Sequence, residues 1–269
     1  MATNKLTYIQ QISVFIPGFG CPATDYIPLI TYLNGHGHTL NQGHVYLAID
    51  LPGHGQSPTS VISAPETGGI NELLIRLHEE VLSDLLSSPP ASLKSIPTVL
   101  YGHSMGTLAV LDLLAHTLSI SSSSLNPTST ILFDSPFDGT ARPTPLDIET
   151  LPAQADQYRP TMPARISRCF GPRTTPDFAT STLENFSRLD LEYAMRVGHY
   201  YQHVDARFAQ ILQALNDHNA QLVAAGNPPV RLLDIQGQEG GFGTKRKSLR
   251  KGDVTAHMRF ARGNWMQGG

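Results

Sequence analysis

The chain alternates short apolar segments with longer segments of helical periodicity. Four mainly apolar runs end in turn-forming residues: "ISVFIPGFG" (residues 12–20), "HVYLAID" (44–50), "TVLYGHS" (98–104) and "STILFDSP" (129–136). Residues 230–235 form a fifth run of this kind. Continuous apolar strands bounded by turns are typical of a parallel sheet covered on both faces.

Helical periodicity separates these runs. The spacing predicts a helix over residues 70–86, a buried helix over 105–118 that is apolar nearly all round, and a long helical stretch over 189–225. Gly198 is the expected kink of the long stretch. Alternating strands and helices predict an α/β fold: an open, mostly parallel sheet with helices on both faces and right-handed crossovers. Residues 136–177 are rich in proline and glycine and predict an irregular insertion over one end of the sheet.

Composition narrows the partners. The formal net charge is −3 and charged residues make up 15% of the 269 positions, so neither nucleic acid nor an anionic membrane is expected. The basic run 244–251 indicates either a solvated loop or a docking patch for an anionic partner. Two cysteines form no disulfide framework or metal site, and His36, His38 and His44 lack metal-ligand spacing. With no secretory signal and no membrane-length apolar run, a cytoplasmic protein is expected.

The segment Gly102-His103-Ser104-Met105-Gly106 has the form G-x-S-x-G. It lies between a predicted strand and a predicted helix, which is the context in which this motif places a serine at the tip of a strained turn. The glycines are needed because strand and helix leave no room for side chains there. His103 is interpreted as a packing residue.

Two further loops follow predicted strands. In "VFIPGFGCP", Gly18 and Gly20 flank Phe19, which allows the Phe19 N–H to point into a site. In "AIDLPGHGQSP", Asp50 begins a glycine-containing tight turn. In order, spacing and motifs the chain resembles the α/β-hydrolase superfamily, in particular its single-domain esterase and lipase-like members.

That resemblance implies roles for several residues. Ser104 would be the nucleophile, and the N–H groups of Met105 and Phe19 would form the oxyanion hole. Residues 1–135 and 226–269 would form the hydrolase core, and residues 136–225 a helical cap insertion with a returning helix. The N-terminal hairpin of the family would be shortened, because only twelve residues precede the first strong strand.

A catalytic serine needs a base and an acid that orients it, in the family order Ser, acid, His. Glu239, in the turn after residues 230–235, is the candidate acid, and Asp134 is the alternative; Asp234 is interpreted as structural. The histidine is expected after a last strand at residues 256–265, beyond Gly269, and His257 is the late histidine within the chain. His199 and His203 are interpreted as helix-face residues.

The sequence therefore predicts a serine hydrolase that cleaves a carboxylic ester, thioester or lactone through an acyl-serine intermediate. Its partner would be a small acyl substrate, no cofactor or metal is implied, and the oligomeric state stays open. Epoxide hydrolysis is disfavoured, because those relatives carry a carboxylate in place of Ser104. Two alternatives remain: a ligand-binding or interaction protein impaired by a missing histidine, and an acyltransferase that uses the same serine.

Overall fold

A parallel sheet of five strands forms the centre of the computed structural model, which describes residues 9–36, 43–59, 62–85, 96–120, 125–136, 145–168, 170 and 174–235. The strands are β1 (Gln11–Ile16), β2 (His44–Ala48), β3 (Pro97–His103), β4 (Asn126–Phe133) and β5 (Arg231–Ile235). Their order is β2-β1-β3-β4-β5, and every neighbouring pair is parallel. The predicted parallel α/β sheet is confirmed.

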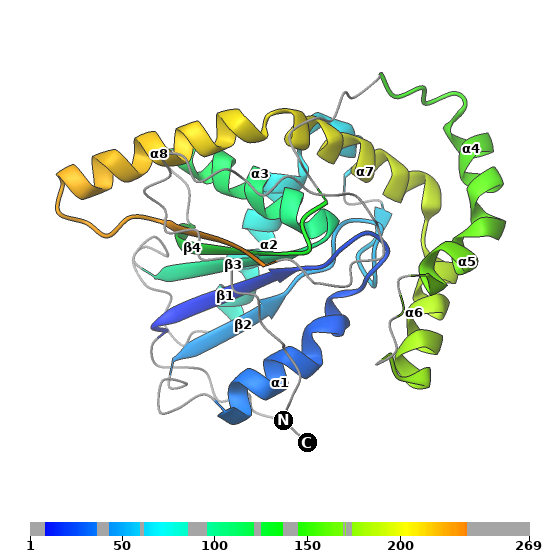
Figure 1. The fold of residues 1–269 in the computed structure, drawn as a ribbon, viewed down its shortest axis with the longest axis horizontal. Coiled ribbons are helices and arrows are strands. Elements are labelled where there is room, and N and C mark those ends of the chain that lie inside the picture. The colour runs from blue at the N-terminus through cyan, green and yellow to red at the C-terminus, as the bar shows by residue number, and fades with distance from the viewer. Residues whose placement is uncertain are drawn as a thin grey trace.

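Helices cover both faces of this sheet. They are α1 (Ile27–His36), α2 (Ile70–Leu85), α3 (Met105–Ser119), α4 (Leu151–Tyr158), α5 (Met162–Ser167), α6 (Pro176–Arg188), α7 (Leu191–Ala206) and α8 (Phe208–Ala224), with short 3-10 turns η1 (Ala23–Tyr26), η4 (Pro65–Thr67) and η6 (Arg159–Thr161). Figure 1 shows α1 on one face, α2, α3 and α8 on the other, and α4 to α6 beyond the carboxyl ends of the strands. In the described part of the chain, no helix has the length and apolarity that a bilayer crossing requires.

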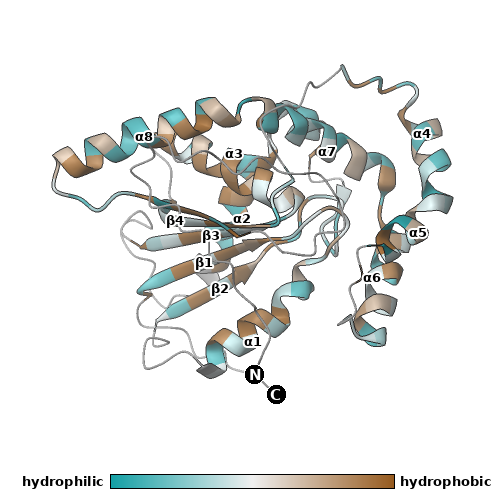
Figure 2. Cartoon of the chain, in the orientation of Figure 1, coloured by the Kyte–Doolittle hydropathy of each residue, from teal (hydrophilic) through white to brown (hydrophobic). Residues whose placement is uncertain are grey.

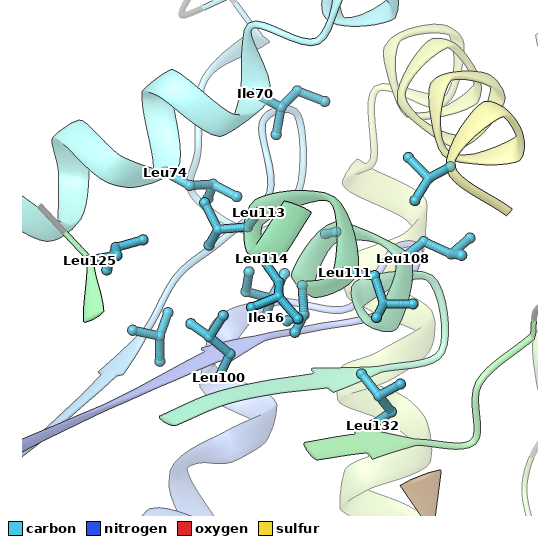
Figure 3. Packing of buried hydrophobic residues seen from close by; sticks show 14 of the residues in the cluster. Ile16, Ile70, Leu74, Leu100, Leu108, Leu111, Leu113, Leu114, Leu125 and Leu132 are labelled. Carbon is cyan, nitrogen blue, oxygen red and sulfur yellow. The ribbon is translucent and has the colours of Figure 1, made fainter. Parts of the chain in front are cut away.

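The main core lies between the sheet and α3. Most residues of α3 are buried, as its uniformly apolar sequence predicts. Leu113 lies beside Leu74 between α3 and α2, while Leu114 faces Ile16 and Leu100 of the sheet (Figure 3). Figure 2 shows the same contrast in hydropathy, with apolar residues concentrated in the strands and α3 and a largely hydrophilic α4. Burial of this apolar surface is the main term that stabilises the fold.

The long helical stretch is divided at Arg207, so the predicted kink at Gly198 is wrong. Asp190 caps the N-terminus of α7, the first of the two helices in this stretch, because its Oδ1 accepts a hydrogen bond from Tyr193 N at 3.1 Å. Gly198 continues within α7. Arg207 leaves the helical conformation at φ −96° and ψ 5°, and its Nη2 lies 3.2 Å from Asp112 Oδ1. The break therefore lies where a distant acceptor contacts the chain, which the local sequence does not show.

The segment predicted to be irregular contains the helices α4 and α5. Proline stands in the first turn of α4, α5 and α6, where its fixed φ suits a helix and its missing N–H has no intrahelical partner in any case. The prolines at these positions begin helices. The high proline content is thus compatible with a helical layer beyond the strand ends.

Asp112 is a buried carboxylate in the middle of the apolar α3, and it joins four parts of the chain. Its side chain accepts hydrogen bonds from Asn71 Nδ2 at 2.6 Å, from the Tyr200 hydroxyl and from Arg207. Asp112 is only 4% exposed. A buried charge costs free energy unless it is paired and hydrogen-bonded, and these three donors supply the partners.

Replacing Asp112 by alanine removes the acceptor and leaves the buried Asn71 amide without this partner. We expect Asp112→Ala to lower the free energy of unfolding by about 2 kcal/mol, measured by urea denaturation. Asp217→Ala, which removes an exposed carboxylate that accepts from Gln213 on α8, is the control and should change it by less than about 0.5 kcal/mol. Equal effects of the two variants would contradict the structural role of Asp112.

The burial of His78 predicts that the free energy of unfolding falls at acid pH. Burial lowers its pKa from 6.5 to about 4, and it is 1% exposed on α2. The unfolded chain therefore takes up a proton near pH 6.5, whereas the folded chain does so only near pH 4. Stability from this group is full above pH 6.5 and falls as the pH decreases towards 4.

We expect His78 to lower the free energy of unfolding of wild type by about 3 kcal/mol between pH 6.5 and pH 4. The His78→Leu variant should lack this part of the decrease. The measurement is the free energy of unfolding in urea across this range, compared with wild type. His54 and His103 stay in both proteins, so the difference reports His78. The exposed His203→Leu serves as the control; a His78→Leu profile parallel to wild type would refute the prediction.

Candidate active site

Ser104 occupies the tight turn between β3 and α3. Its backbone has φ 50° and ψ −123°, and among the described non-glycine residues only Asp134 shares a positive φ. Such a conformation costs free energy, so surrounding contacts must hold it. Ser104 N donates to Phe133 O at 2.9 Å, and Ser104 O accepts from Thr107 N at 2.9 Å and from Thr107 Oγ1 at 2.6 Å.

The glycines on either side of this turn allow close backbone packing. A Cβ on Gly102 would lie 2.5 Å from Gly106 O, and one on Gly106 would lie 2.2 Å from Ile16 O and 2.5 Å from Pro17 O. No side chain fits at these distances. The crowding that the sequence predicts is present, and it holds the start of α3 against the end of β1.

The loop after β1 runs directly beside Ser104. A Cβ on Gly18 would lie 3.0 Å from Ser104 Cβ and 3.2 Å from His103 O. Among the described residues, none accepts a hydrogen bond from the backbone N–H of Phe19 or of Met105, the first residue of α3. Unpaired N–H groups beside a helix N-terminus can hydrogen-bond an anionic oxygen.

Asp50 holds the second loop, after β2, against the first. Its carboxylate accepts hydrogen bonds from Ala23 N at the start of η1 and from Gln56 N at 2.9 Å. Gly55, at φ 55°, lies so close that a Cβ would meet the Asp50 carboxylate at 2.3 Å. Asp50 therefore fixes both its own turn and the residues that follow Phe19.

His54, in this second loop, is a site neighbour that the sequence interpretation did not single out. It is fully buried, its Nδ1 lies 3.1 Å from Pro52 O, and its ring meets the Phe19 ring edge-on at a centroid distance of 5.8 Å. Burial lowers the pKa of His54, which favours the neutral imidazole. The signal in the sequence was its place between the two glycines of "PGHG".

Asp134 and His103 lie at the ends of neighbouring strands. Asp134 follows β4 with φ 48°, and its N–H donates to Ile235 O at 2.9 Å. Burial lowers the pKa of His103, and the negative charge of Asp134 opposes that shift. Asp234 accepts a hydrogen bond from Ser135 Oγ at 2.8 Å, consistent with its predicted structural role.

Glu239, the predicted acid, and His257, the late histidine, stay predictions. Glu239 and His257 lie outside the described residues, as do the basic run 244–251 and the expected last strand. Within the described segments, no imidazole hydrogen-bonds Ser104 Oγ. His199 and His203 form a ring pair on α7 with centroids 5.2 Å apart.

Other polar features of the described chain lie along α7. A cavity of about 240 Å³ is lined by Thr59, Ile62 and Ser63 and by residues at the start of α7. A second, of about 450 Å³, is lined by η4 and the end of α7. Neither lining includes Ser104.

Arg196 joins the two regions through a paired contact with Glu66, at 2.9 and 3.2 Å. In the residues that the structure describes, no three His, Cys, Asp or Glu side chains gather in a way that would hold a metal ion.

The alpha/beta hydrolase family model matches residues 14–254, and the chain belongs to that family. A hydrolase from Oleispira antarctica is similar in structure, with a TM-score of 0.55 and 14% identity over 88% of this chain and 77% of the other. An esterase from Exiguobacterium antarcticum has a TM-score of 0.51 and 17% identity, over 86% of this chain and 80% of the other. The Cif epoxide hydrolase from Acinetobacter nosocomialis has a TM-score of 0.52 and 20% identity, over 87% of this chain and 69% of the other. At these identities the likeness shows the fold alone. No curated protein gives a significant match.

The crowding at Gly106 predicts that this position tolerates no side chain. We expect Gly106→Ala to destabilise the protein by more than about 3 kcal/mol or to prevent folding, because its Cβ would overlap backbone oxygens that have no room to move. Gly35→Ala in α1 is the matched control: nothing lies within 4 Å of its Cβ, and alanine should stabilise that helix slightly. Thermal unfolding of the two variants gives the comparison, and a fully stable Gly106→Ala protein would contradict the packing.

Proposed function

We propose that this hydrolase-family protein cleaves a carboxylic ester, thioester or lactone through an acyl-Ser104 intermediate. The observation that carries the proposal is the strained turn at Ser104, with the unpaired N–H groups of Phe19 and Met105 in the segments on either side of it. The family match supports a hydrolase in general, and the chemistry of a serine at this turn supports acyl transfer to that residue.

The proposed reaction has two halves. Ser104 Oγ attacks the carbonyl carbon while a base takes its proton, and the resulting oxyanion accepts hydrogen bonds from Phe19 N–H and Met105 N–H. Collapse of this intermediate breaks the bond to the leaving oxygen or sulfur, to which the base returns the proton, and leaves the acyl-serine ester; the alcohol or thiol departs, or in a lactone stays on the acyl chain as a hydroxyl. Water, deprotonated by the base, then attacks the acyl carbon; the bond to Ser104 Oγ breaks, the base returns the proton to that oxygen, and the carboxylic acid leaves.

A histidine would be the base, with Glu239 or Asp134 as the acid that orients it. His257 is the candidate base within the chain. Helices α4 to α6 lie beyond the carboxyl ends of the strands (Figure 1). In this proposal residues 136–225 supply a cap insertion over the substrate and a returning helix, on the core formed by residues 1–135 and 226–269. The substrate is a small acyl compound, and no cofactor takes part.

Ser104 also argues against epoxide opening, although one structural neighbour is an epoxide hydrolase. Attack on an epoxide by a carboxylate gives an ester, which water can cleave. The same attack by Ser104 would give a serine ether, which water does not cleave under these conditions. A serine at this turn therefore favours substrates with a carbonyl carbon.

Labelling with a fluorophosphonate probe, read by intact mass, tests the proposal. We expect one probe per folded wild-type chain and none on Ser104→Ala, whose ester hydrolysis should fall by about a thousandfold or more. Ser119→Ala, an exposed serine at the end of α3, is the control and should label as wild type does.

Three outcomes separate the alternatives. Label on Ser104→Ala would refute Ser104 as the nucleophile, and absence of label on folded wild type would favour a ligand-binding protein. Label with an acylated alcohol as the main product would favour acyl transfer over hydrolysis. In a labelling protein, His257→Ala, Glu239→Ala and Asp134→Ala identify the base and the acid by which variants lose the label.

A further inference from the structure

Phe19 lies where two separate apolar clusters meet. The main core packs between the sheet and helices α2, α3, α7 and α8. A smaller cluster, which we call the cap cluster, is built on four buried residues: Ala155, Leu189, Leu191 and Ala194. Among the described residues, Phe19 is the one partly buried side chain that packs against both. A displacement of one cluster relative to the other would therefore change the packing of Phe19.

Phe186 is the residue through which α6 reaches the loop of Phe19. Gly20 has φ 72°, and a Cβ there would lie 2.1 Å from Phe186 Cε1 and 2.2 Å from Cζ. The edge of the Phe186 ring thus rests against the Gly20 backbone. The same ring lies 6.3 Å from the Phe19 ring, at an angle of 44°.

Phe19 also contacts the loop after β2. His54 contacts the Phe19 ring edge-on from the loop after β2, and Asp50 ties that loop to Ala23. The Phe19 ring thus contacts one side chain from the core, His54, and one from α6, Phe186. The Cys21 N–H donates to Gly18 O at 3.1 Å and closes the turn that carries Phe19 and Gly20.

We propose that Phe186 is a positioning residue for the reaction at Ser104. By resting on Gly20 and packing beside Phe19, it holds the Phe19 N–H in the orientation that stabilises the oxyanion. The role in catalysis rests on the proposed function; the hold on the loop does not. Helix α6 thereby determines the geometry beside Ser104 without touching the reacting atoms, since hydrogen-bond donors are effective only when they are oriented before the oxyanion forms.

Phe186→Ala, Phe186→Leu and Phe178→Ala test this proposal in the full chain. Phe178 is the matched control, because it lies on the same helix and is 46% exposed. The first measurement is hydrogen exchange of the Cys21 amide, which needs no activity. We expect about tenfold faster exchange in Phe186→Ala, a smaller change in Phe186→Leu and none in Phe178→Ala.

The second measurement is the rate of ester hydrolysis. We expect kcat of Phe186→Ala to fall by about tenfold or more with little change in KM, because misplacement of the donor acts on the transition state. A raised KM with unchanged kcat would show that Phe186 merely lines the substrate pocket and would overturn the positioning role.

Failures of the two proposals are distinguishable. Unchanged Cys21 exchange in Phe186→Ala would overturn the hold of Phe186 on the loop, even if wild type hydrolyses esters normally. A wild type without probe label or hydrolysis would overturn the proposed function, and with it the positioning role in catalysis. Faster exchange in that inactive protein would still support the structural contact between α6 and the Phe19 loop.

Discussion

The close approach of α3 to the end of β1 is the constraint on which the rest of the structure depends. Gly106 lies against the carbonyl groups of Ile16 and Pro17, and Gly102 lies against Gly106. With no side chain at either position, the chain can reverse within one residue, and Ser104 must adopt a positive φ to do so. The same approach places α3 deep beneath its neighbours, which explains why it is apolar on nearly all sides.

This buried helix carries one charged side chain, Asp112, among its buried residues, and that side chain contacts the helices that cover α3. Asp112 accepts hydrogen bonds from Asn71 on α2, from Tyr200 on α7 and from Arg207 between α7 and α8. An apolar residue at this position would remove the shared acceptor of these three donors and leave the buried Asn71 amide without it. The carboxylate therefore specifies how α2, α7 and α8 sit on α3, where apolar contacts alone would allow several arrangements.

Local patterns predict what local physics determines. The strands, α2, α3 and the Ser104 turn follow from apolar periodicity and glycine placement, and each is found within a few residues of its expected bounds. Contacts between distant segments leave no such pattern. The break at Arg207 depends on Asp112, ninety-five positions away, and the Phe186 contact with Gly20 joins residues still further apart. His78 lies four residues after the buried Leu74, on the same face of α2, but a pattern of apolar residues does not mark a polar histidine as buried.

Backbone hydrogen bonds link the ends of β3, β4 and β5 in turn. These links bear on whether Asp134 or Glu239 is the better candidate for the catalytic acid. Ser104 N donates to Phe133 O at the end of β4, and Asp134 N donates to Ile235 O at the end of β5. Each bond fixes the first residue after one strand relative to the last residue of the next. Asp134 directly follows Phe133, which accepts the hydrogen bond from Ser104 N. Glu239 comes after Ile235, which is linked to Asp134 and not to Ser104 itself. Asp134 has a positive φ of 48°, a conformation that surrounding contacts such as its bond to Ile235 O must hold. An acid there would be oriented by the same bonds that hold the Ser104 turn, whereas an acid at Glu239 would depend on contacts made after Ile235.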